Sequence, residues 1–450
     1  MEPPFLGRAR ELAVLEELAG SRRAELFVLY GRRRVGKTEL LQQLCRGRRS
    51  VYFSAAEVRD KDNLRAFKGA LQEGLGDALT EHVEFSDWSA ALGYAAERAG
   101  SERLVVVLDE FPYLCEANKG LPSLVQRFWD QKGKRSNLML VLCGSQVSFM
   151  EKEVLAESSP LFGRRTGQRR LEPLAPTETL AFFPRWPMRD RVLAYAILGG
   201  MPAYLRRFDD AEPLSVNLAR EMLRPEGYLF GEVQFLLRSE LTSPHTYNSI
   251  LAAVARGAER VGDIALSVGV DSPTANKYLH VLRELYLVER STPLTDPDPL
   301  RSRRGVYRIL DRFLAFHFRH LQPHLSLIEA GRGGRVYEEF LLPDFERLHD
   351  DAWTDFVLEH LAREAAELVG EELVETGRHP GKAVRALART ARGHGVLAAL
   401  AGPDGAPPKG LAAEVQALST VFPEVVTLLY TPTGKPEAPL APRRVRIEAR

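Results

Sequence analysis

Residues 25–38 are Glu-Leu-Phe-Val-Leu-Tyr-Gly-Arg-Arg-Arg-Val-Gly-Lys-Thr, an apolar run followed by a glycine-rich loop. The apolar and aromatic residues 26–30 predict a short buried strand of a parallel sheet. Residues 31–38 match the phosphate-loop pattern G-x-x-x-x-G-K-[ST] at every fixed position. Leucines then recur at helical spacing beyond Thr38. Strand, loop and helix start together predict a nucleotide-phosphate site in an α/β domain.

The residue types of this loop suit a bound nucleotide. Gly31 and Gly36 permit a tight turn that directs backbone N–H groups inward. Lys37 is expected to reach the β and γ phosphates, and the Thr38 hydroxyl to bind Mg²⁺. The alternative is a glycine turn that carries Lys-Thr by chance, which the flanking strand and helix disfavour. The predicted nucleotide-binding residues are Gly31, Arg32, Arg33, Arg34, Val35, Gly36, Lys37, Thr38 and Glu39.

A pair of carboxylates follows a second aliphatic run. Residues 104–108 predict a buried strand that delivers Asp109 and Glu110 to the edge of the sheet where α/β proteins bind ligands. Asp109 suits the Mg²⁺ coordination sphere, and Glu110 is placed to orient or deprotonate an attacking water. The alternative is a strand that ends in ordinary surface acids. A strand-like segment between the two motifs favours P-loop enzymes with an inserted strand and a glutamate base.

Three further residues are weaker candidates in the same region. Ser145 follows an apolar run at 138–144 and suits a sensor of the γ-phosphate or of water, although a Gly-Ser turn explains it equally well. Arg164 and Arg165 suit stabilisation of charge on the transferred phosphate, from within the chain or from a neighbour. Their alternative is a solvated or helix-pairing role. The guanine-specific pattern N-K-x-D is absent, which favours adenine and therefore ATP.

Composition limits the remaining possibilities. The net charge is +1, so any nucleic-acid surface must be a local patch. The cysteines, Cys45, Cys115 and Cys143, lack zinc-ligand spacing and fit a reducing cytosol. We find neither a signal peptide nor an apolar run long enough to span a bilayer. The expectation is a cytoplasmic protein without a membrane partner.

Several motifs recur in a fixed order from residue 5 to about residue 330. They are Phe5-x-Gly-Arg, the loop 31–38, and segments 108–114, 142–145, 163–167 and 198–205. Together they resemble the archaeal-type ATPase family, prokaryotic relatives of AAA+ and STAND ATPases. The resemblance implies ATP binding, slow hydrolysis and a winged-helix domain. In such relatives, a Gly-Pro element like the one at Pro202 packs near the base and couples it to the next domain; the alternative is a helix-breaking loop.

The predicted fold is an α/β P-loop domain with a parallel sheet of the inserted-strand type, followed by a helical lid, a winged-helix domain and an α+β domain. The predicted boundaries are residues 1–175 for the P-loop ATPase domain, 176–239 for the lid, 240–310 for the winged helix, 311–432 for the C-terminal domain and 433–450 for a flexible tail.

The winged-helix prediction rests on three helical segments followed by two short strands. The third helix is expected to begin at Ser272 as N-cap, with Pro273 in its first turn. Possible DNA contacts are exposed cations on this helix and on the loop between the strands. The alternative is a packing and relay module with solvated cations. The residues are Lys277, Arg283, Arg301, Arg303 and Arg304.

In the resembled family, the last third of the chain often carries a restriction-endonuclease-like fold, which needs clustered carboxylates and a lysine. Residues 382–402 contain no Asp or Glu, so we predict a degenerate, non-cleaving relative or a diverged fold. His317, His320 and His324 lie among aromatic residues and predict core packing rather than a metal site. Residues 425–430 predict a late strand.

The favoured hypothesis is an Mg²⁺-dependent ATPase whose nucleotide state moves the winged helix, as a switch on double-stranded DNA, a protein partner or a second copy of the chain. The alternative is a scaffold that holds nucleotide with little turnover. A third hypothesis, phosphoryl transfer to a small molecule, lacks a visible acceptor site.

Overall fold

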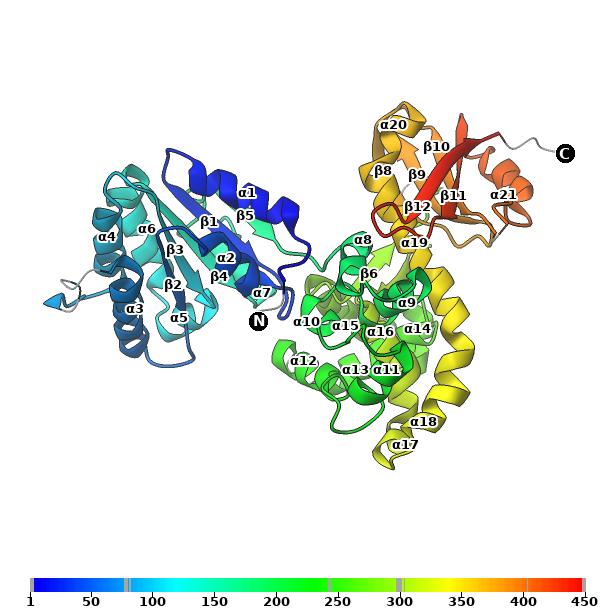
Figure 1. Ribbon diagram of the computed structural model, residues 1–450, viewed down its shortest axis with the longest axis horizontal. Coiled ribbons are helices and arrows are strands. Elements are labelled where there is room, and N and C mark those ends of the chain that lie inside the picture. The colour runs from blue at the N-terminus through cyan, green and yellow to red at the C-terminus, as the bar shows by residue number, and fades with distance from the viewer. Residues whose placement is uncertain are drawn as a thin grey trace. The chain divides into compact units, whose positions relative to one another are not determined.

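The computed structural model describes residues 4–76, 80, 82–241, 244–296, 302, 304–402 and 404–446. Its chain divides into two compact units, and each is described by itself (Figure 1). Unit 1 comprises Met1–Leu174 and Met201–Ala203, and unit 2 comprises Ala175–Gly200 and Tyr204–Arg450. The finer division of unit 2 into lid, winged helix and C-terminal domain stays a prediction.

Unit 1 contains a five-stranded sheet in which every strand pair is parallel. The strand order is β2-β3-β4-β1-β5, so β4 separates the strand before the glycine loop from the strand that ends in Asp109. The predicted parallel α/β sheet with an inserted strand is therefore confirmed. The strands are β1 (Glu25–Tyr30), β2 (Ser50–Ser54), β3 (Leu104–Asp109), β4 (Leu138–Gly144) and β5 (Gly167–Arg170).

The central strands have continuous apolar sequences because both faces of the sheet are covered. Every residue of β1, β3 and β4 is buried. Figure 1 shows helices on both sides of this sheet. Because parallel strands end at one common edge, the residues that follow β1, β3 and β4 come together there. The helices are α1 (Ala9–Gly20), α2 (Lys37–Cys45), α3 (Asp60–Leu75), α4 (Trp88–Ala99), α5 (Phe111–Ala117), α6 (Leu121–Gln131) and α7 (Val147–Phe149).

The described residues between 176 and 239 form helices, as the mixed apolar spacing predicted. The apolar run Val192–Leu198 lies in α9 and is buried along its whole length. The helices are α8 (Pro176–Thr179), α9 (Met188–Leu198), α10 (Pro202–Leu205), α11 (Leu214–Glu221) and α12 (Glu232–Glu240).

Three helices and a two-stranded antiparallel sheet follow. They are α13 (Pro244–Ala255), α14 (Val261–Val268), α15 (Ser272–Glu284), β6 (Val288–Ser291) and β7 (Val306–Ile309). This order is the one expected of a winged helix, an assignment that stays a prediction. The prediction of Ser272 as N-cap is wrong: Asp271 caps α15, because its carboxylate accepts a 2.8 Å hydrogen bond from the Thr274 N–H.

The C-terminal part has a second five-stranded sheet, in the order β12-β11-β10-β9-β8. β10 and β11 are parallel and the other pairs are antiparallel. The predicted strand at 425–430 is confirmed as part of β11. The strands of this sheet are β8 (Leu373–Arg378), β9 (Val384–Thr390), β10 (Gly395–Leu400), β11 (Val425–Pro432) and β12 (Leu440–Val445). The helices from residue 312 onward are α16 (Arg312–Phe316), α17 (Leu325–Glu329), α18 (Gly333–Val336), α19 (Phe345–Arg363), α20 (Ala365–Val369) and α21 (Leu411–Leu418).

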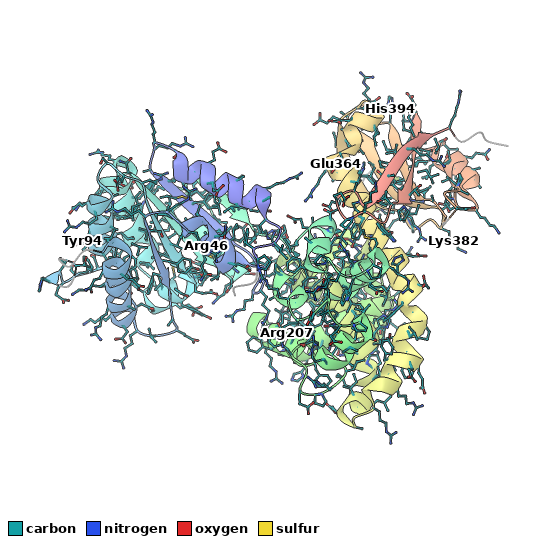
Figure 2. All side chains as sticks on the ribbon, viewed as in Figure 1. Arg46, Tyr94, Arg207, Glu364, Lys382 and His394 are labelled. Carbon is teal, nitrogen blue, oxygen red and sulfur yellow. The ribbon has the colours of Figure 1, made fainter. Side chains whose placement is uncertain are left out.

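The prediction of a flexible tail over residues 433–450 is wrong for its middle. Residues 440–445 form β12, which pairs antiparallel with β11. β12 is an edge strand, where proline and arginine are tolerated, so its backbone can still pair with that of β11. The turn between β9 and β10 carries His394, which is labelled in Figure 2 and whose Nδ1 lies 2.9 Å from Glu371 Oε1.

No helix in the described part of the chain is both long and apolar enough to cross a membrane. His317 and His320 are buried, 1% and 6% exposed. Across the described ranges, no group of three or more His, Cys, Asp and Glu side chains is arranged to hold a metal ion.

Candidate nucleotide-binding site

The loop from Gly31 to Thr38 has an unusual backbone course. A Cβ atom on Gly31 would lie 2.5 Å from the carbonyl oxygen of Leu171, so the close approach requires glycine. Gly36 caps α2 with φ of 93°, and Arg34 has φ of 69°. Positive φ is easy for Gly36 but uncommon for arginine. α2 begins directly after this turn, so its first backbone N–H groups lie at the end of the loop.

Lys37 is buried within the loop, with only 6% of its surface exposed. Its Nζ donates hydrogen bonds to the carbonyl oxygens of Gly31, at 2.8 Å, and Arg32, at 3.0 Å. These bonds hold the ammonium group against the backbone of the loop. A buried cation beside the N-terminus of a helix favours an anion such as phosphate.

Asp109 connects the loop to the end of β3. Its Oδ2 accepts hydrogen bonds from the Thr38 hydroxyl, at 2.9 Å, and from the Tyr52 hydroxyl, at 2.6 Å. Its Oδ1 accepts from the backbone N–H of Glu110. Burial raises the pKa of Tyr52, and the Asp109 carboxylate raises it further, so the phenol keeps its proton and acts as a donor.

Glu110 and Ser145 meet at the same edge of the sheet. The Ser145 hydroxyl donates a 2.8 Å hydrogen bond to Glu110 Oε2. Ser145 follows β4 and is 2% exposed, whereas Glu110 follows β3 and is half-buried. Glu110 also has φ of 54°. A non-glycine residue in the left-handed region costs roughly 1–3 kcal/mol and is typically found at functional sites.

Thr38 and Asp109 are suitable ligands for Mg²⁺. This ion prefers oxygen ligands and usually takes only one or two from the protein. The Thr38 hydroxyl and the Asp109 carboxylate are such oxygens, and a 2.9 Å hydrogen bond already joins them. The residues present therefore fit the ion, which would supply positive charge beside the phosphates.

Sequence reasoning missed two residues of this site. Arg8 is 3% exposed, and its guanidinium donates a 2.9 Å hydrogen bond to the carbonyl oxygen of Val35 in the loop. The motif Phe5-x-Gly-Arg is a signal that could have identified it. Tyr52 lies on β2, and no local pattern links it to Asp109. Both contacts join residues that are distant in the sequence.

The other loop residues differ in what they contact. The guanidinium of Arg33 donates a 2.8 Å hydrogen bond to the Tyr113 hydroxyl on α5. Arg32 and Val35 are buried, at 8% and 1% exposure, and Glu39 is half-buried on α2. A nucleotide-binding role for these side chains stays a prediction.

Pro202 lies beside the loop, because a Cβ atom on Gly36 would be 3.5 Å from Pro202 Cγ. Arg164 and Arg165 have other partners. Arg164 pairs with Asp130 on α6 at 3.0 Å, and Arg165 donates to the carbonyl oxygen of Leu155 at 3.0 Å. Neither of these contacts involves the loop or the two strand-end carboxylates.

The predicted DNA contacts belong to unit 2. Lys277 and Arg283 are exposed on α15, and Arg304 is exposed before β7. Arg301 and Arg303 lie outside the described residues. The structure thus leaves the side chains of Lys277, Arg283 and Arg304 accessible to solvent.

Comparisons with known proteins show what the chain is similar to. A family described as an ATPase domain predominantly from Archaea matches residues 5–208. An uncharacterized protein of Methanocaldococcus jannaschii is 34% identical over 364 residues, which cover 80% of this chain and 76% of the relative. A solved structure of a Walker-type ATPase of Pyrococcus abyssi has a TM-score of 0.52 and 23% identity, and the match covers 70% of this chain and 96% of that one. The ORC2 protein of Aeropyrum pernix has a TM-score of 0.47 and 15% identity, over 74% of this chain and 96% of that one.

Proposed function

Since the chain belongs to the ATPase family found predominantly in Archaea, we propose that it binds ATP with Mg²⁺, hydrolyses it slowly and uses the nucleotide state as a regulatory switch. The observation that carries this proposal is the hydrogen bond between Thr38 and Asp109, because it brings the phosphate loop and the second carboxylate motif into one site. A glycine turn that carried Lys-Thr by chance would have no reason to contact the Asp109 carboxylate.

Each residue of the site has a proposed task. Lys37 and the N–H groups at the start of α2 bind the β and γ phosphates and offset the charge that develops on them. Thr38 and Asp109 hold Mg²⁺. Glu110 accepts a proton from the attacking water. Ser145, through its 2.8 Å hydrogen bond, holds the Glu110 carboxylate in place.

We also propose roles for three further residues. Pro202 Cγ lies 3.5 Å from where a Cβ atom on Gly36 would be, so we propose that Pro202 transmits the state of the loop to the chain that follows. Arg164 and Arg165 contact other parts of unit 1. We propose that they stabilise phosphate charge only after a rearrangement or in the site of a neighbouring copy.

The test of nucleotide binding is a titration of the full chain with ATP and Mg²⁺, comparing wild type, Lys37→Ala and the control Lys134→Ala, which removes an exposed lysine. We expect Lys37→Ala to weaken ATP binding about 100-fold, since it removes a buried charge-assisted contact. Lys134→Ala should bind as wild type. Equal ATP binding by all three proteins would refute the assignment of the loop.

A second candidate function is DNA binding by residues 244–309. The observation that favours it is the exposure of Lys277 and Arg283 on α15. Fluorescence anisotropy with a double-stranded oligonucleotide at several salt concentrations tests it. A variant that lacks one cation bound to a DNA phosphate should have a salt slope smaller by about one unit. Lys277→Glu should show this decrease, whereas the control Arg332→Glu should not. If the chain binds no DNA and scarcely turns over ATP, the scaffold alternative is favoured.

A further inference from the structure

Unit 2 contains a cavity of about 440 Å³ that the nucleotide site does not use. Its walls come from α9, the end of α13 and the chain after it, strands β6 and β7, α16 and the helical residues after it, α19, and the end of β8 with the residues that follow. This volume lies within the roughly 300–1,000 Å³ of small-molecule sites. Segments that are distant in the sequence therefore surround a space of ligand size.

Arginine dominates the charged lining of this cavity. Five guanidinium groups line it, against three carboxylates, Glu259, Asp351 and Asp355. The apolar walls include Val254, Pro293 and Phe316. The arginines are Arg308, Arg312, Arg319, Arg347 and Arg378.

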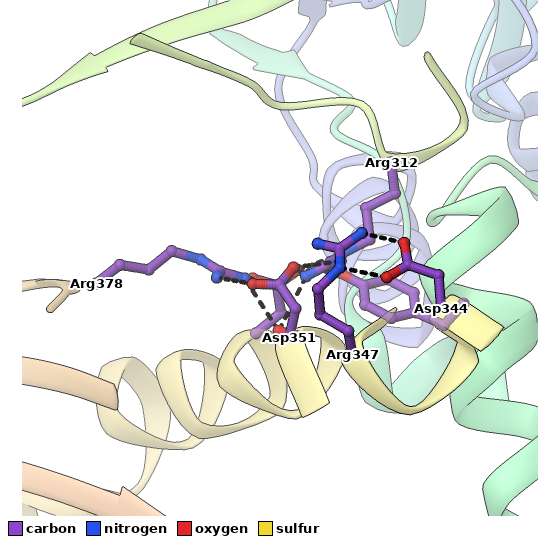
Figure 3. Close-up of polar contacts among 7 residues, drawn as sticks. Arg312, Asp344, Arg347, Asp351 and Arg378 are labelled. Atoms are coloured by element: carbon purple, nitrogen blue, oxygen red, sulfur yellow. Dashed lines mark hydrogen bonds and ion pairs between the residues drawn. The ribbon is translucent and has the colours of Figure 1, made fainter. Parts of the chain in front are cut away.

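Two of the arginines, Arg312 and Arg378, form ion pairs with aspartates of α19 (Figure 3). Arg312 pairs with Asp351 at 2.9 Å and with Asp355 at 2.5 Å. Arg378 pairs with Asp351 at 2.7 Å and also with Asp355. Tyr195 donates a 2.9 Å hydrogen bond to Asp355. Burial alone would raise the pKa of Asp355, but Arg312 and Arg378 outweigh it and lower that pKa. Both aspartates are therefore ionised and already partnered.

Some arginine N–H donors at the cavity are left over once these ion pairs have formed. Nε of Arg378 is buried and has no hydrogen-bond partner among the described residues. Arg319 donates one long hydrogen bond, 3.4 Å to the carbonyl oxygen of Ala255, and in the described part of the chain it forms no ion pair. A buried unsatisfied donor such as Nε of Arg378 is rare in proteins and calls for a partner, whereas Arg319 is exposed and open to a ligand.

Arg319 and Arg347 place positive charge at the more exposed side of the cavity. Arg347 is paired with Asp344, as Figure 3 shows. Desolvation and the charge of Arg347 lower the pKa of Arg319, and the nearby carboxylates of Asp344 and Asp351 offset this effect only in part. His320 also lines the cavity. Burial lowers the pKa of His320 to about 4, which leaves it neutral at pH 7. An anion beside Arg319 would stabilise its positive charge.

We propose that this cavity binds a small organic phosphate, no larger than about a mononucleotide. A phosphate monoester carries roughly 1.5 to 2 negative charges and accepts several hydrogen bonds, which suits Arg319 and the free Nε of Arg378. A ligand with a single carboxylate would fit less well, because Asp351 and Asp355 already supply carboxylates to Arg312 and Arg378. The apolar wall accommodates the uncharged part of the ligand. Bound there, the ligand touches both the β6–β7 hairpin and the C-terminal sheet.

The test uses the full chain with the substitution Lys37→Ala, so that the phosphate loop does not compete for the ligand. Binding is measured by isothermal titration calorimetry with three probes. These are AMP, inorganic phosphate and adenosine, which has the body of AMP without its phosphate. The variants added are Arg319→Gln, Arg378→Gln and the control Arg332→Gln, which alters an exposed arginine outside the cavity. Circular dichroism checks that each variant folds.

We expect AMP and inorganic phosphate to bind and adenosine to bind at least tenfold more weakly than AMP. Arg319→Gln, on the surface, should weaken AMP binding about tenfold without loss of fold, since it removes a charge-assisted hydrogen bond. Arg332→Gln should have no effect. The proposal is overturned if neither phosphate probe binds, if adenosine binds as well as AMP, or if Arg319→Gln and Arg332→Gln bind AMP equally.

Discussion

The two units bind their main carboxylates in opposite ways. In unit 1, Asp109 and Glu110 accept hydrogen bonds from neutral hydroxyls, those of Thr38, Tyr52 and Ser145. In unit 2, Asp351 and Asp355 are bound by the guanidinium groups of Arg312 and Arg378. A neutral donor orients a carboxylate and leaves its charge free for a cation or a proton. An arginine pair neutralises the carboxylate and fixes the elements that carry it.

This difference fits the proposed roles, which are catalysis at the site in unit 1 and structural support by the ion pairs in unit 2. Arg312 lies in α16, Arg378 ends β8, and both aspartates lie on α19. Their ion pairs therefore hold α19 between the helical part and the C-terminal sheet. In unit 1 the corresponding contacts join the loop and the sheet edge without cancelling charge. We expect mutations to affect stability in unit 2 and catalysis in unit 1.

The largest expected effect on stability is that of Asp355→Asn. Removing one partner of this partly buried ion-pair network leaves a charge uncompensated, which costs up to about 3–5 kcal/mol. Denaturant unfolding of the full chain measures the change. The matched variant Asp109→Asn should lose less, about 1–2 kcal/mol, because neutral donors rather than arginines bind that carboxylate and asparagine keeps one acceptor oxygen. Equal losses in the two variants would remove the distinction between the units.

The second prediction concerns the buried histidine of unit 2. Burial lowers the pKa of His317 to about 4, and neither ring nitrogen has a hydrogen-bond partner in the described part of the structure. The unfolded chain takes up the proton near pH 6.5, whereas the folded chain does so only near pH 4. Stability should therefore fall as the pH decreases from 6.5 to about 4.

His317→Phe removes this contribution. Its free energy of unfolding should depend less on pH in that window, by about 1.4 kcal/mol per pH unit. His320 contributes in the same direction, since burial lowers its pKa to about 4 as well. The control His280→Gln alters an exposed histidine on α15 and should leave the slope unchanged. A His317→Phe slope identical to that of wild type would show that this histidine is protonated in the folded chain.

The smallest expected effect is that of Tyr52→Phe in unit 1. The change removes one 2.6 Å hydrogen bond from Asp109, a loss of about 0.5–1.5 kcal/mol. Because Asp109 is a proposed Mg²⁺ ligand, we expect the Mg²⁺ concentration for half-maximal ATP turnover to shift about three- to tenfold, with a smaller change in ATP affinity. Tyr113→Phe, which affects Arg33 instead, is the control. If both variants shift the Mg²⁺ dependence equally, Tyr52 has no specific role at Asp109.

The sequence allowed the fold and the centre of the site in unit 1 to be predicted because their residues are contiguous. The loop 31–38 and the pair Asp109 and Glu110 each follow an apolar strand within a few positions. The contacts of Arg8 and Tyr52 depend on pairing between distant segments, which no local pattern reveals. Sequence order likewise gave no indication that Arg164 pairs with Asp130 on α6.

The C-terminal sheet was harder to predict for a different physical reason. β9 has the sequence Val-Arg-Ala-Leu-Ala-Arg-Thr, and alanine and arginine are not typical strand residues. Packing overrides this weak preference, since Val384, Leu387 and their neighbours are buried against α21 and Phe422. β12 contains a proline and two arginines, and only its pairing with β11 defines it. The cavity in unit 2 depends on the same long-range packing.

The most direct test of the account is steady-state ATP hydrolysis with Mg²⁺ by wild type and Glu110→Gln, with ATP binding measured on the same samples. We predict that Glu110→Gln binds ATP as wild type does and loses turnover by a factor of about 100 or more, because the general base is gone. Turnover of Glu110→Gln at the wild-type rate would contradict the account and place the base elsewhere in the site.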